Sequence, residues 1–514
     1  MSLLRCSRAA LALLMAGCAV GPNYRRPTLE APAAWKEAAE PGDALWQEAA
    51  PQDDAPRGPW WEIFDDPQLN ALEAQAAQVN QSVEAALARL EQARALARLP
   101  VADLLPTLDS HPSYSNFQRA LGSFGGAGSL TNSEFDLPFD LSYEVDLWGK
   151  VRRSFEAARA EAQASRAAYE TVLLSVTAET ARTYFLLRAL DAELDALKKT
   201  VELRREAGRL IDQRAEAGLA SELDRARVEA EVKTAEAESF DVERRRAEAE
   251  HALAVLCGRA ASDFSLPPKP LDAAPPYVPS GIPSRALERR PDIAEAERLM
   301  AAANAQIGVA KAAAFPVLTL TGSGGWQSAK LENLITSGSD VWSFGPSLSI
   351  PIFAGGRSTA TVKARRAEHR QAAAEYRRRV LVALQEVEDA LAAGRLLARQ
   401  QIAQAGVVEA SRHAAALSLD RYTQGLTSFL DVVDAERGRL EAERRASQIL
   451  GQRMAAAILL IKALGGGWDA TPDTAAESAA QVGGLDERVP GEPLGGVGED
   501  HPAGLQHVSP VSNL

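Results

Sequence analysis

The chain has 514 residues, a formal net charge of −13 and only 6% aromatic residues. It has no concentrated basic patch, which argues against nucleic acid as a partner. No stretch of about 18 uninterrupted apolar residues occurs, so no transmembrane helix is predicted, and any membrane crossing would have to use β-strands. Abundant alanine, glutamate and arginine favour long helices.

The N-terminus has the pattern of an export signal. Two arginines precede a short apolar run, which ends in Ala16-Gly17 directly before Cys18. This predicts a signal peptide over residues 1–17. A cysteine after Ala-Gly is similar to a bacterial lipobox, in which Cys18 would be acylated and become the first mature residue. An ordinary signal peptide with an incidental cysteine is the alternative.

The sequence also contains an internal repeat. Arg214–Glu231 and Arg421–Gly438 share the pattern Arg-x-x-x-Gly-Leu-x-Ser-x-Leu-Asp at an offset of 207 (421 − 214). Upstream the offset becomes 210, which aligns Asn80 with Arg290. Such self-similarity is typical of duplicated structural units. The predicted segments after the signal are a lipidated extended segment (18–64), a first repeat (65–262), a Pro-rich connector (263–285), a second repeat (286–467) and a disordered tail (468–514).

Each repeat is predicted to be a helix, two strands, a very long helix, a turn and another helix. No proline occurs over Lys150–Leu266 or Phe353–Thr471. We expect Val151–Ala217 and Ser358–Gln424 to be single helices about 100 Å long, at about 1.5 Å per residue. Their apolar residues recur in steps of three and four, which predicts coiled-coil-like packing.

Four strands are predicted from period-two alternation of apolar and polar residues. Glu134–Leu147 alternates throughout, and Trp342–Ile352 is its counterpart in the second repeat. Val317–Gln327 should form a hairpin with the latter around Ala329–Asp340. Thr107–Phe117 is the least defined strand because it contains a proline, which cannot donate to a sheet. The clearly alternating strands are long enough to cross a bilayer, which takes about 9–11 residues.

Four strands cannot close a barrel, because known membrane barrels begin at about eight strands. Several chains would therefore have to share one barrel. Two copies would give eight strands and three would give twelve, and periodicity does not choose between them.

Five segments carry a resemblance to a known family. They are CAVGPNYRRP (Cys18–Pro27), WWEIFDDPQLNAL (Trp60–Leu72), YEVDLWGKVRR (Tyr143–Arg153), RRPDIAEAERLMAAANAQIGVAKAAAFPVLTLTG (Arg289–Gly322) and PSLSIPIFAGGR (Pro346–Arg357). In these the chain resembles the TolC-like outer-membrane efflux proteins, in the NodT-type lipoprotein branch.

The resemblance implies a mixed α+β, mostly α fold that works as a homotrimer. Helical hairpins would form an α-barrel, and four strands per chain would contribute to a shared twelve-stranded β-barrel. The implied partners are outer-membrane lipid, a periplasmic adaptor protein and an inner-membrane transporter of the RND type. The implied location is the outer membrane, with an extension into the periplasm.

No catalytic constellation emerges from the sequence. The six histidines are scattered without metal-ligand spacing, and no phosphate-binding loop or nucleophile elbow is present. We therefore expect neither an enzyme nor a metal site, and no cofactor besides the covalent lipid on Cys18.

The repeated turn is the better candidate site. Gly218 and Gly425 should end the long helices, and Ser221 and Ser428 should cap the next ones. In relatives the adaptor meets the channel at this tip. The predicted docking residues are Gly218, Leu219, Ser221, Gly425, Leu426 and Ser428.

An acidic pair follows the second turn. Asp431 and Asp434 share one helix face, and by resemblance they match paired aspartates that ring the periplasmic entrance of the pore. Such a ring favours cations and can bind a blocking ion. A pair on the surface without this role is the alternative. By resemblance Asp224 belongs to the closed tip, and Tyr422 is a further candidate for packing at the gate.

Acidic residues also occupy alternate positions along the first long predicted strand. Because their neighbours would face lipid, we expect these side chains to line the channel: Glu134, Asp136, Asp140, Glu144 and Asp146. The predicted function is passive conduction of drugs or other small toxic compounds through the outer-membrane channel of a tripartite pump. A duct for protein or peptide secretion and a periplasmic coiled-coil scaffold without a pore are the alternatives.

Overall fold

The computed structural model describes residues 19–27, 32, 34–37, 58–120, 129–218, 220–278 and 289–466. All of them belong to one compact unit, residues 1–468. Four sequence predictions lie outside the described residues: the signal peptide, the lipidated Cys18, Leu219 and the C-terminal tail.

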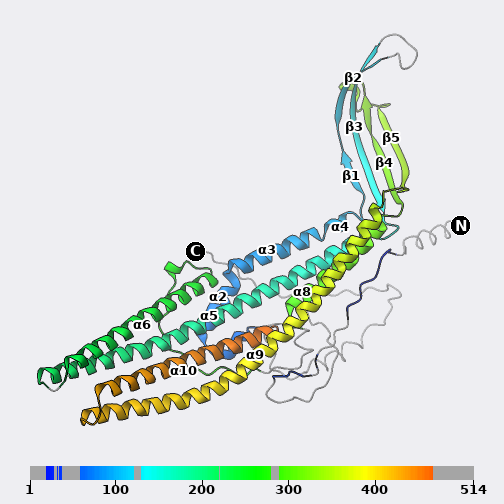
Figure 1. Cartoon of the computed structure of the whole chain (residues 1–514). Coiled ribbons are helices and arrows are strands. Elements are labelled where there is room, and N and C mark those ends of the chain that lie inside the picture. The colour runs from blue at the N-terminus through cyan, green and yellow to red at the C-terminus, as the bar shows by residue number, and fades with distance from the viewer. Residues whose placement is uncertain are drawn as a thin grey trace, which may run out of the picture. The chain divides into compact units, whose positions relative to one another are not determined.

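The fold is mixed α+β and mostly α, as predicted. The elements of the first half are η1 (Trp60–Phe64), α2 (Pro67–Val79), α3 (Gln81–Leu96), α4 (Leu99–Ala102), β1 (Thr107–Ser110), β2 (Ser113–Ala120), β3 (Ser129–Val145), α5 (Lys150–Glu216), α6 (Glu222–Leu256) and η3 (Ala261–Asp263). Those of the second half are α8 (Pro291–Ala312), β4 (Val317–Ser328), η4 (Leu331–Asn333), β5 (Asp340–Ser349), α9 (Arg357–Thr423) and α10 (Phe429–Ala463) (Figure 1).

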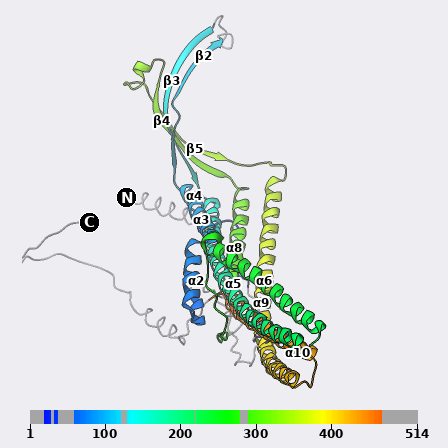
Figure 2. The same cartoon turned by 90° about the vertical axis from the view of Figure 1, so that its left-hand side faces the viewer.

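The two halves repeat each other in helix length. The long helices α5 and α9 have 67 residues each, and α6 and α10 have 35 each. In both views the long helices run from the strands to the turns that lead into α6 and α10 (Figure 2). The two predicted long helices are confirmed to within one residue at each end.

The halves differ before the sheet. At the offset of 210, the uninterrupted helix α8 of the second half corresponds to residues 81–102 of the first half, which are divided into α3 and α4. The Asn80 side chain accepts hydrogen bonds from the backbone N–H groups of Ser82 and Val83, and it donates to the Leu256 carbonyl at 2.8 Å. Asn80 therefore starts α3 and ties it to the end of α6.

The sheet is antiparallel with the strand order β1-β3-β4-β5, and β2 also pairs with β3. The predicted strand Thr107–Phe117 is thus wrong as a single strand. It divides around His111-Pro112 because proline lacks the N–H that the ladder needs. The strand predicted to reach Ile352 ends at Ser349, and a proline follows at 351. The predicted hairpin between β4 and β5 is confirmed.

The sheet has two outer edges. On one side β1 and β2 pair only with β3, and on the other side β5 pairs only with β4. The helices also follow one another from the first half to the second, because α6 packs on α5, α5 packs on α8 and α10, and these two pack on α9. The described chain therefore ends on both sides in elements with a neighbour on one side only.

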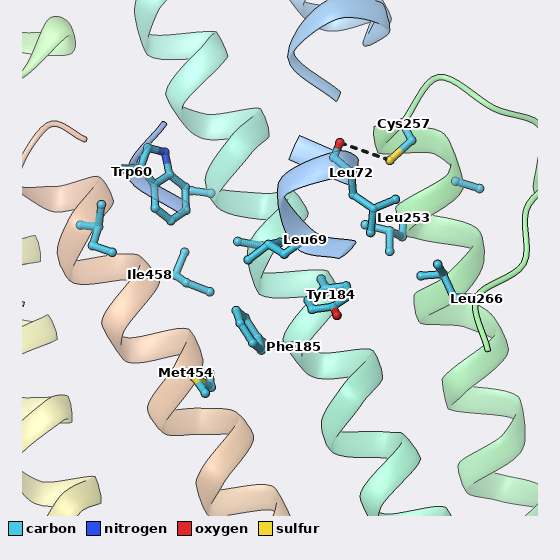
Figure 3. Packing of buried hydrophobic residues seen from close by; sticks show 14 of the residues in the cluster. Trp60, Leu69, Leu72, Tyr184, Phe185, Leu253, Cys257, Leu266, Met454 and Ile458 are labelled. Atoms are coloured by element: carbon cyan, nitrogen blue, oxygen red, sulfur yellow. Dashed lines mark hydrogen bonds between the residues drawn. The ribbon is translucent and has the colours of Figure 1, made fainter. Parts of the chain in front are cut away.

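The largest apolar cluster lies where α2, α5, α6 and α10 meet. Trp60 and Leu69 pack there against Phe185 of α5 and Ile458 of α10 (Figure 3). Cys257, the residue after α6, is fully buried in this cluster, and its Sγ donates to the Leu72 carbonyl at 3.8 Å. Burial raises the pKa of this thiol to about 11, so it stays protonated and unreactive.

A buried ion-pair network fixes the Pro-rich connector beside these helices. Asp191 of α5 is fully buried and contacts Arg188 at 2.8 Å and Arg246 of α6 at 2.6 Å. It also accepts the backbone N–H of Lys269 at 3.0 Å. Arg188 donates to the Pro267 carbonyl at 2.8 Å. Because buried charges need partners, this network holds the connector against α5 and α6.

Glu73 of α2 is a buried carboxyl group without a good partner. It is fully buried, and neither carboxyl oxygen accepts a well-formed hydrogen bond. Burial raises its pKa to about 9, and the nearby backbone of Ala181 opposes this only in part. The side chain is therefore protonated at neutral pH in the folded protein.

The raised pKa of Glu73 predicts a pH-dependent stability. The folded state keeps the Glu73 proton that the unfolded chain releases above its ordinary pKa near 4.5. Stability is therefore fully present below that value and falls by about 1.4 kcal/mol per pH unit up to about pH 9.

Thermal unfolding of wild type and Glu73→Gln from pH 4.5 to pH 8.5 tests this, because the glutamine is neutral at every pH. We expect Glu73→Gln to gain Tm relative to wild type as the pH rises. The exposed Glu84→Gln serves as control and should follow wild type. Parallel curves for wild type and Glu73→Gln would contradict the assignment.

Candidate functional site

The two predicted turns end the long helices in the same way. Gly218 has a φ of 71° and Gly425 a φ of 75°, a left-handed conformation that side chains disfavour. A Cβ would meet nothing within 4 Å at either glycine. Backbone conformation rather than crowding therefore requires glycine here.

Each turn leads into a capping box. Ser221 Oγ accepts the backbone N–H of Asp224 at 3.2 Å, and the Asp224 carboxylate accepts the Ser221 N–H, also at 3.2 Å. Ser428 and Asp431 form the same reciprocal box at the start of α10. The repeated Ser-x-x-Asp spacing is the sequence signal for both boxes, of which only the capping serines were predicted.

The two predicted gate aspartates differ in their surroundings. Asp431 accepts the Ser428 N–H at 3.0 Å and the Ser428 hydroxyl at 2.9 Å, and the Thr427 hydroxyl also donates to it. These bonds, chiefly that from Thr427, hold its pKa below the ordinary range. The Asp434 side chain is 62% exposed, and its one described ion pair is to Arg437 at 3.7 Å. Asp434 is the freer carboxylate.

Tyr422 packs where the two hairpins meet. Its ring contacts the Phe429 ring edge-to-face at 5.4 Å, and the Arg214 guanidinium lies 5.0 Å from its centroid. Ile211, Val228, Phe429, Val432 and Val433 form the buried cluster beside it. These residues come from α5, α6 and α10, so the cluster joins the first hairpin (α5 and α6) to the second (α9 and α10).

Ion pairs continue this contact between the hairpins. Arg444 of α10 lies 2.8 Å from Glu193 of α5 and 2.9 Å from Glu238 of α6. Nearer the turns, Glu231 of α6 pairs with Arg204 of α5 at 3.2 Å and with Arg437 of α10. No local sequence pattern predicts these residues, because their partners are far apart in the chain.

The described docking residues lie at the turns. Leu426 is 62% exposed, and the neighbouring Leu223 and Leu430 are also exposed. Gly218, Ser221, Gly425 and Ser428 lie beside them. The tip therefore presents apolar side chains on a framework fixed by the two capping boxes.

The predicted channel-lining acids are divided between the sheet and its junction with α5. Glu134, Asp136, Asp140 and Glu144 lie on β3 and are half-buried. Glu144 pairs with Lys150 at 3.0 Å. Asp146 lies beyond the end of β3, where it accepts the backbone N–H groups of Val151 and Arg152. Asp146 thus holds the start of α5 against the sheet.

Residues 19–27 lie against this junction. The Val20 N–H donates to the Trp148 carbonyl at 3.0 Å, and Asn304 of α8 donates to the Pro22 carbonyl at 3.0 Å. A Cβ at Gly21 would lie 2.6 Å from the backbone of Gly308, so only glycine fits there. The chain immediately after Cys18 is therefore fixed beside the boundary between sheet and helices.

Two kinds of feature are absent from the described residues. No cluster of three or more His, Cys, Asp or Glu side chains in that part of the chain could hold a metal ion. No helix within the same residues combines the length and apolar character needed to span a bilayer.

This fold is shared with outer-membrane channels of known structure. The channel OprN aligns with a TM-score of 0.80 at 31% identity, covering 88% of this chain and all of that one. The open state of the Neisseria gonorrhoeae MtrE channel aligns with a TM-score of 0.75 at 31% identity, covering 88% of this chain and 98% of the other. The chain thus has the fold of an outer-membrane channel protein.

Sequence comparison identifies the family. The profile of the outer membrane efflux proteins matches residues 72–259 and 282–466. The solvent efflux pump outer membrane protein SrpC of Pseudomonas putida is 33% identical over 459 residues, which is 89% of this chain and 97% of SrpC. OprJ of Pseudomonas aeruginosa is 33% identical over 467 residues, 89% of this chain and 95% of OprJ.

The chain belongs to the outer membrane efflux protein family, which confirms the predicted resemblance. This is a transport family rather than an enzymatic one, and its members act in the outer membrane and extend into the periplasm.

The capping geometry predicts that the first turn of α10 loses protection against hydrogen exchange when Ser428, the partner of Asp431 in the capping box, is replaced. Ser428→Ala removes a cap worth about 1 kcal/mol, so amide exchange in the first turn of α10 should accelerate about fivefold. Because the pKa of Asp431 is lowered, this protection is present at neutral pH and is lost only as the pH falls through that lowered pKa.

Hydrogen–deuterium exchange with mass spectrometry measures both effects. Ser221→Ala is the matched control and should accelerate exchange only at the start of α6. Equal exchange at α10 in Ser428→Ala and wild type would refute the role of the box.

Proposed function

We propose that the chain is the outer-membrane channel of a tripartite efflux pump and conducts small toxic compounds passively, without catalysis or a cofactor. The observation that carries this proposal is the open arrangement of the chain, in which the sheet and the helices both end in elements with a neighbour on one side only. A pore requires that such edges meet across copies of the chain. The family and its outer-membrane relatives supply the class of function.

The assembly we propose is a ring of three copies. The backbone of β5 on its outer side would pair with β1 and β2 of the next copy, giving twelve strand positions in a closed sheet. Unpaired edges in lipid would cost several kcal/mol per backbone group. A head-to-tail contact of this kind closes into a ring when its rotation allows.

Exposed apolar side chains on the outer helices support the same contact. Phe240 is 68% and Val255 67% exposed on α6, and Ile402 is 76% and Leu381 67% exposed on α9. Large apolar side chains gathered on outer helices are typical of surfaces that another protein covers. In the proposed ring α6 of one copy lies against α9 of the next.

The gate we propose lies at the helical tip, with Asp434 as its freest acid and Asp431 held by its capping box. Three copies would bring six carboxylates together, which favours cations and their block of the pore. Tyr422 and Asp224 hold the two turns beside it. Opening would separate the first hairpin from the second near the turns, where the cluster around Phe429 and the ion pair of Glu231 with Arg437 join them.

The proposed partners follow from the N-terminal segment and from the turns at the helical tip. Lipidation at Cys18 would anchor the chain in the outer membrane, and the fixed path of residues 19–27 supports this by holding the chain beside the sheet. The exposed Leu426 and the repeated glycine turns offer the surface for a periplasmic adaptor protein. An inner-membrane transporter of the RND type would supply the energy that this chain lacks.

If the chain forms a trimer through α6 and α9, one charged substitution on either helix should break the assembly into monomers. We expect wild type to run as three copies in native mass spectrometry, and Ile402→Asp or Phe240→Asp to release monomers, because a buried unpaired charge opposes association. The control Leu331→Asp replaces another exposed apolar residue, which lies in the β4–β5 hairpin, and this variant should remain trimeric. Monomeric wild type, or trimers from both helix variants, would contradict the proposed contact.

The gate predicts a larger conductance when its acids are removed. In planar bilayers, Asp434→Ala combined with Asp431→Ala should raise single-channel conductance and weaken block by divalent cations, because fewer carboxylates attract the ion. Glu409→Ala, at an exposed acid on α9 away from the turn, should behave like wild type. If the protein conducts but the double substitution has no effect, the gate assignment is wrong, while the channel assignment stands.

A further inference from the structure

The two halves of the chain pack in the same way around their long helices. Helix α3 packs on α5 as α8 packs on α9. Under the offsets of 210 and 207, the apolar clusters at these two contacts contain equivalent residues: Val83, Tyr169, Leu173 and Val176 in the first half, and Ile293, Tyr376, Val380 and Ala383 in the second. The repeat therefore extends from the sequence to individual packing contacts.

One contact of this repeat is made only once within the described chain. Helix α8 also packs on α5, whereas its counterpart α3 makes no comparable contact with α9. Within one copy α5 and α8 lie between α3 and α9, which form the two outer sides of the helices next to the sheet (Figure 1). The missing contact could therefore be made only with the α9 of a second copy.

The surfaces that this contact would bury are exposed in the single chain. Arg153 and Ala157 of α5 are buried on the face that meets α8, and Ala305 and Gly308 of α8 are buried as well. Their counterparts are all exposed: Ala360 and Ala364 on α9, and Ala95 and Arg98 on α3. A face that is buried in one repeat and open in the other indicates that the next unit of the repeat covers it.

The large and small side chains at this contact are exchanged between the halves. A Cβ at Gly308 would lie 2.8 Å from Cγ of Arg153, so the arginine lies directly against the glycine backbone. At the equivalent positions α9 has Ala360 and α3 has Arg98. Each pair sets one arginine against one small residue, a combination that lets two helices approach closely. The exchange defines a register in which Arg98 lies level with Ala360.

Charged side chains complement each other in this register. Because α3 leads into the sheet and α9 leads out of it, the two helices would be antiparallel. Glu91 would then lie level with Ala367, since each is seven residues from the pair just described. Lys363 and Arg370 lie one turn to either side of Ala367. All three charged side chains are exposed, and none has an ion pair with another described residue.

We propose that α3 of one copy packs antiparallel on the first part of α9 of the next copy, with Arg98 level with Ala360 and Glu91 between Lys363 and Arg370. The occupant of this surface is thus a second copy of the same chain. The inference rests on the proposed ring, and it adds a contact beside the sheet to the one proposed between α6 and α9. The charges fix the register, and the alanines allow the close approach.

Disulfide crosslinking of the full chain in membranes tests this register. Ala95→Cys combined with Ala364→Cys should link copies into covalent dimers and trimers on oxidation, because the two positions would lie almost level. Ala95→Cys combined with Ala374→Cys should not, because position 374 lies about 15 Å further along α9. The equivalent pair Ala157→Cys and Ala305→Cys should form its disulfide within one chain and leave the mass unchanged. Each single variant should stay unlinked.

The same proteins in native mass spectrometry separate failure of the register from failure of the ring. Trimers without the disulfide of Ala95→Cys with Ala364→Cys, or with one from Ala95→Cys with Ala374→Cys instead, would overturn this inference and leave the ring standing. Monomers without any disulfide between chains would overturn both.

Reversal of charge tests the ion pairs. Glu91→Lys should weaken each contact between copies about threefold, the size expected for an exposed ion pair, and so lower the share of trimer on dilution. Adding Lys363→Glu and Arg370→Glu to this variant should restore the trimer. Arg89→Glu, on the opposite face of α3, should behave like wild type. A trimer that Glu91→Lys leaves unchanged, or that the combined variant fails to restore, would overturn the pairing.

Discussion

The two open sides of the chain are the constraint on which the rest of the structure depends. Backbone N–H and C=O groups on the outer sides of β5 and of β1 and β2 have no neighbouring strand within the described chain. The outer helices α6 and α9 also carry large apolar side chains that are exposed in the single chain. A single copy, as described, neither pairs these strand edges nor covers these apolar side chains, so the fold is complete only in an assembly.

The interior of the chain explains how such an open arrangement stays ordered. The apolar cluster around Trp60 and Phe185 and the ion pairs of Asp191 hold α5, α6 and the connector together. Nearer the turns the hairpins meet through a smaller apolar cluster around Phe429 and through buried ion pairs of Glu193 and Glu231 with arginines of α10. A smaller contact separates more readily than the larger apolar core, which suits a tip that opens.

Local rules made much of the fold predictable. The absence of proline over two long stretches predicted α5 and α9 closely, and the shared Gly-Leu-x-Ser pattern predicted both turns. The ion pairs of Arg437 and Arg444 were not predictable, because they join residues about two hundred positions apart and no periodicity records such pairs. The division of the first strand depends on a single proline, which overrides the repeat.

A structure of the full chain in lipid nanodiscs, determined by electron cryomicroscopy, would show whether the open edges meet between copies. We expect three copies in a ring, with β5 of one hydrogen-bonded to β1 and β2 of the next and α6 packed against α9 across the same boundary. A single copy whose outer edges are covered by its own residues, or an assembly that leaves β5 unpaired, would contradict it.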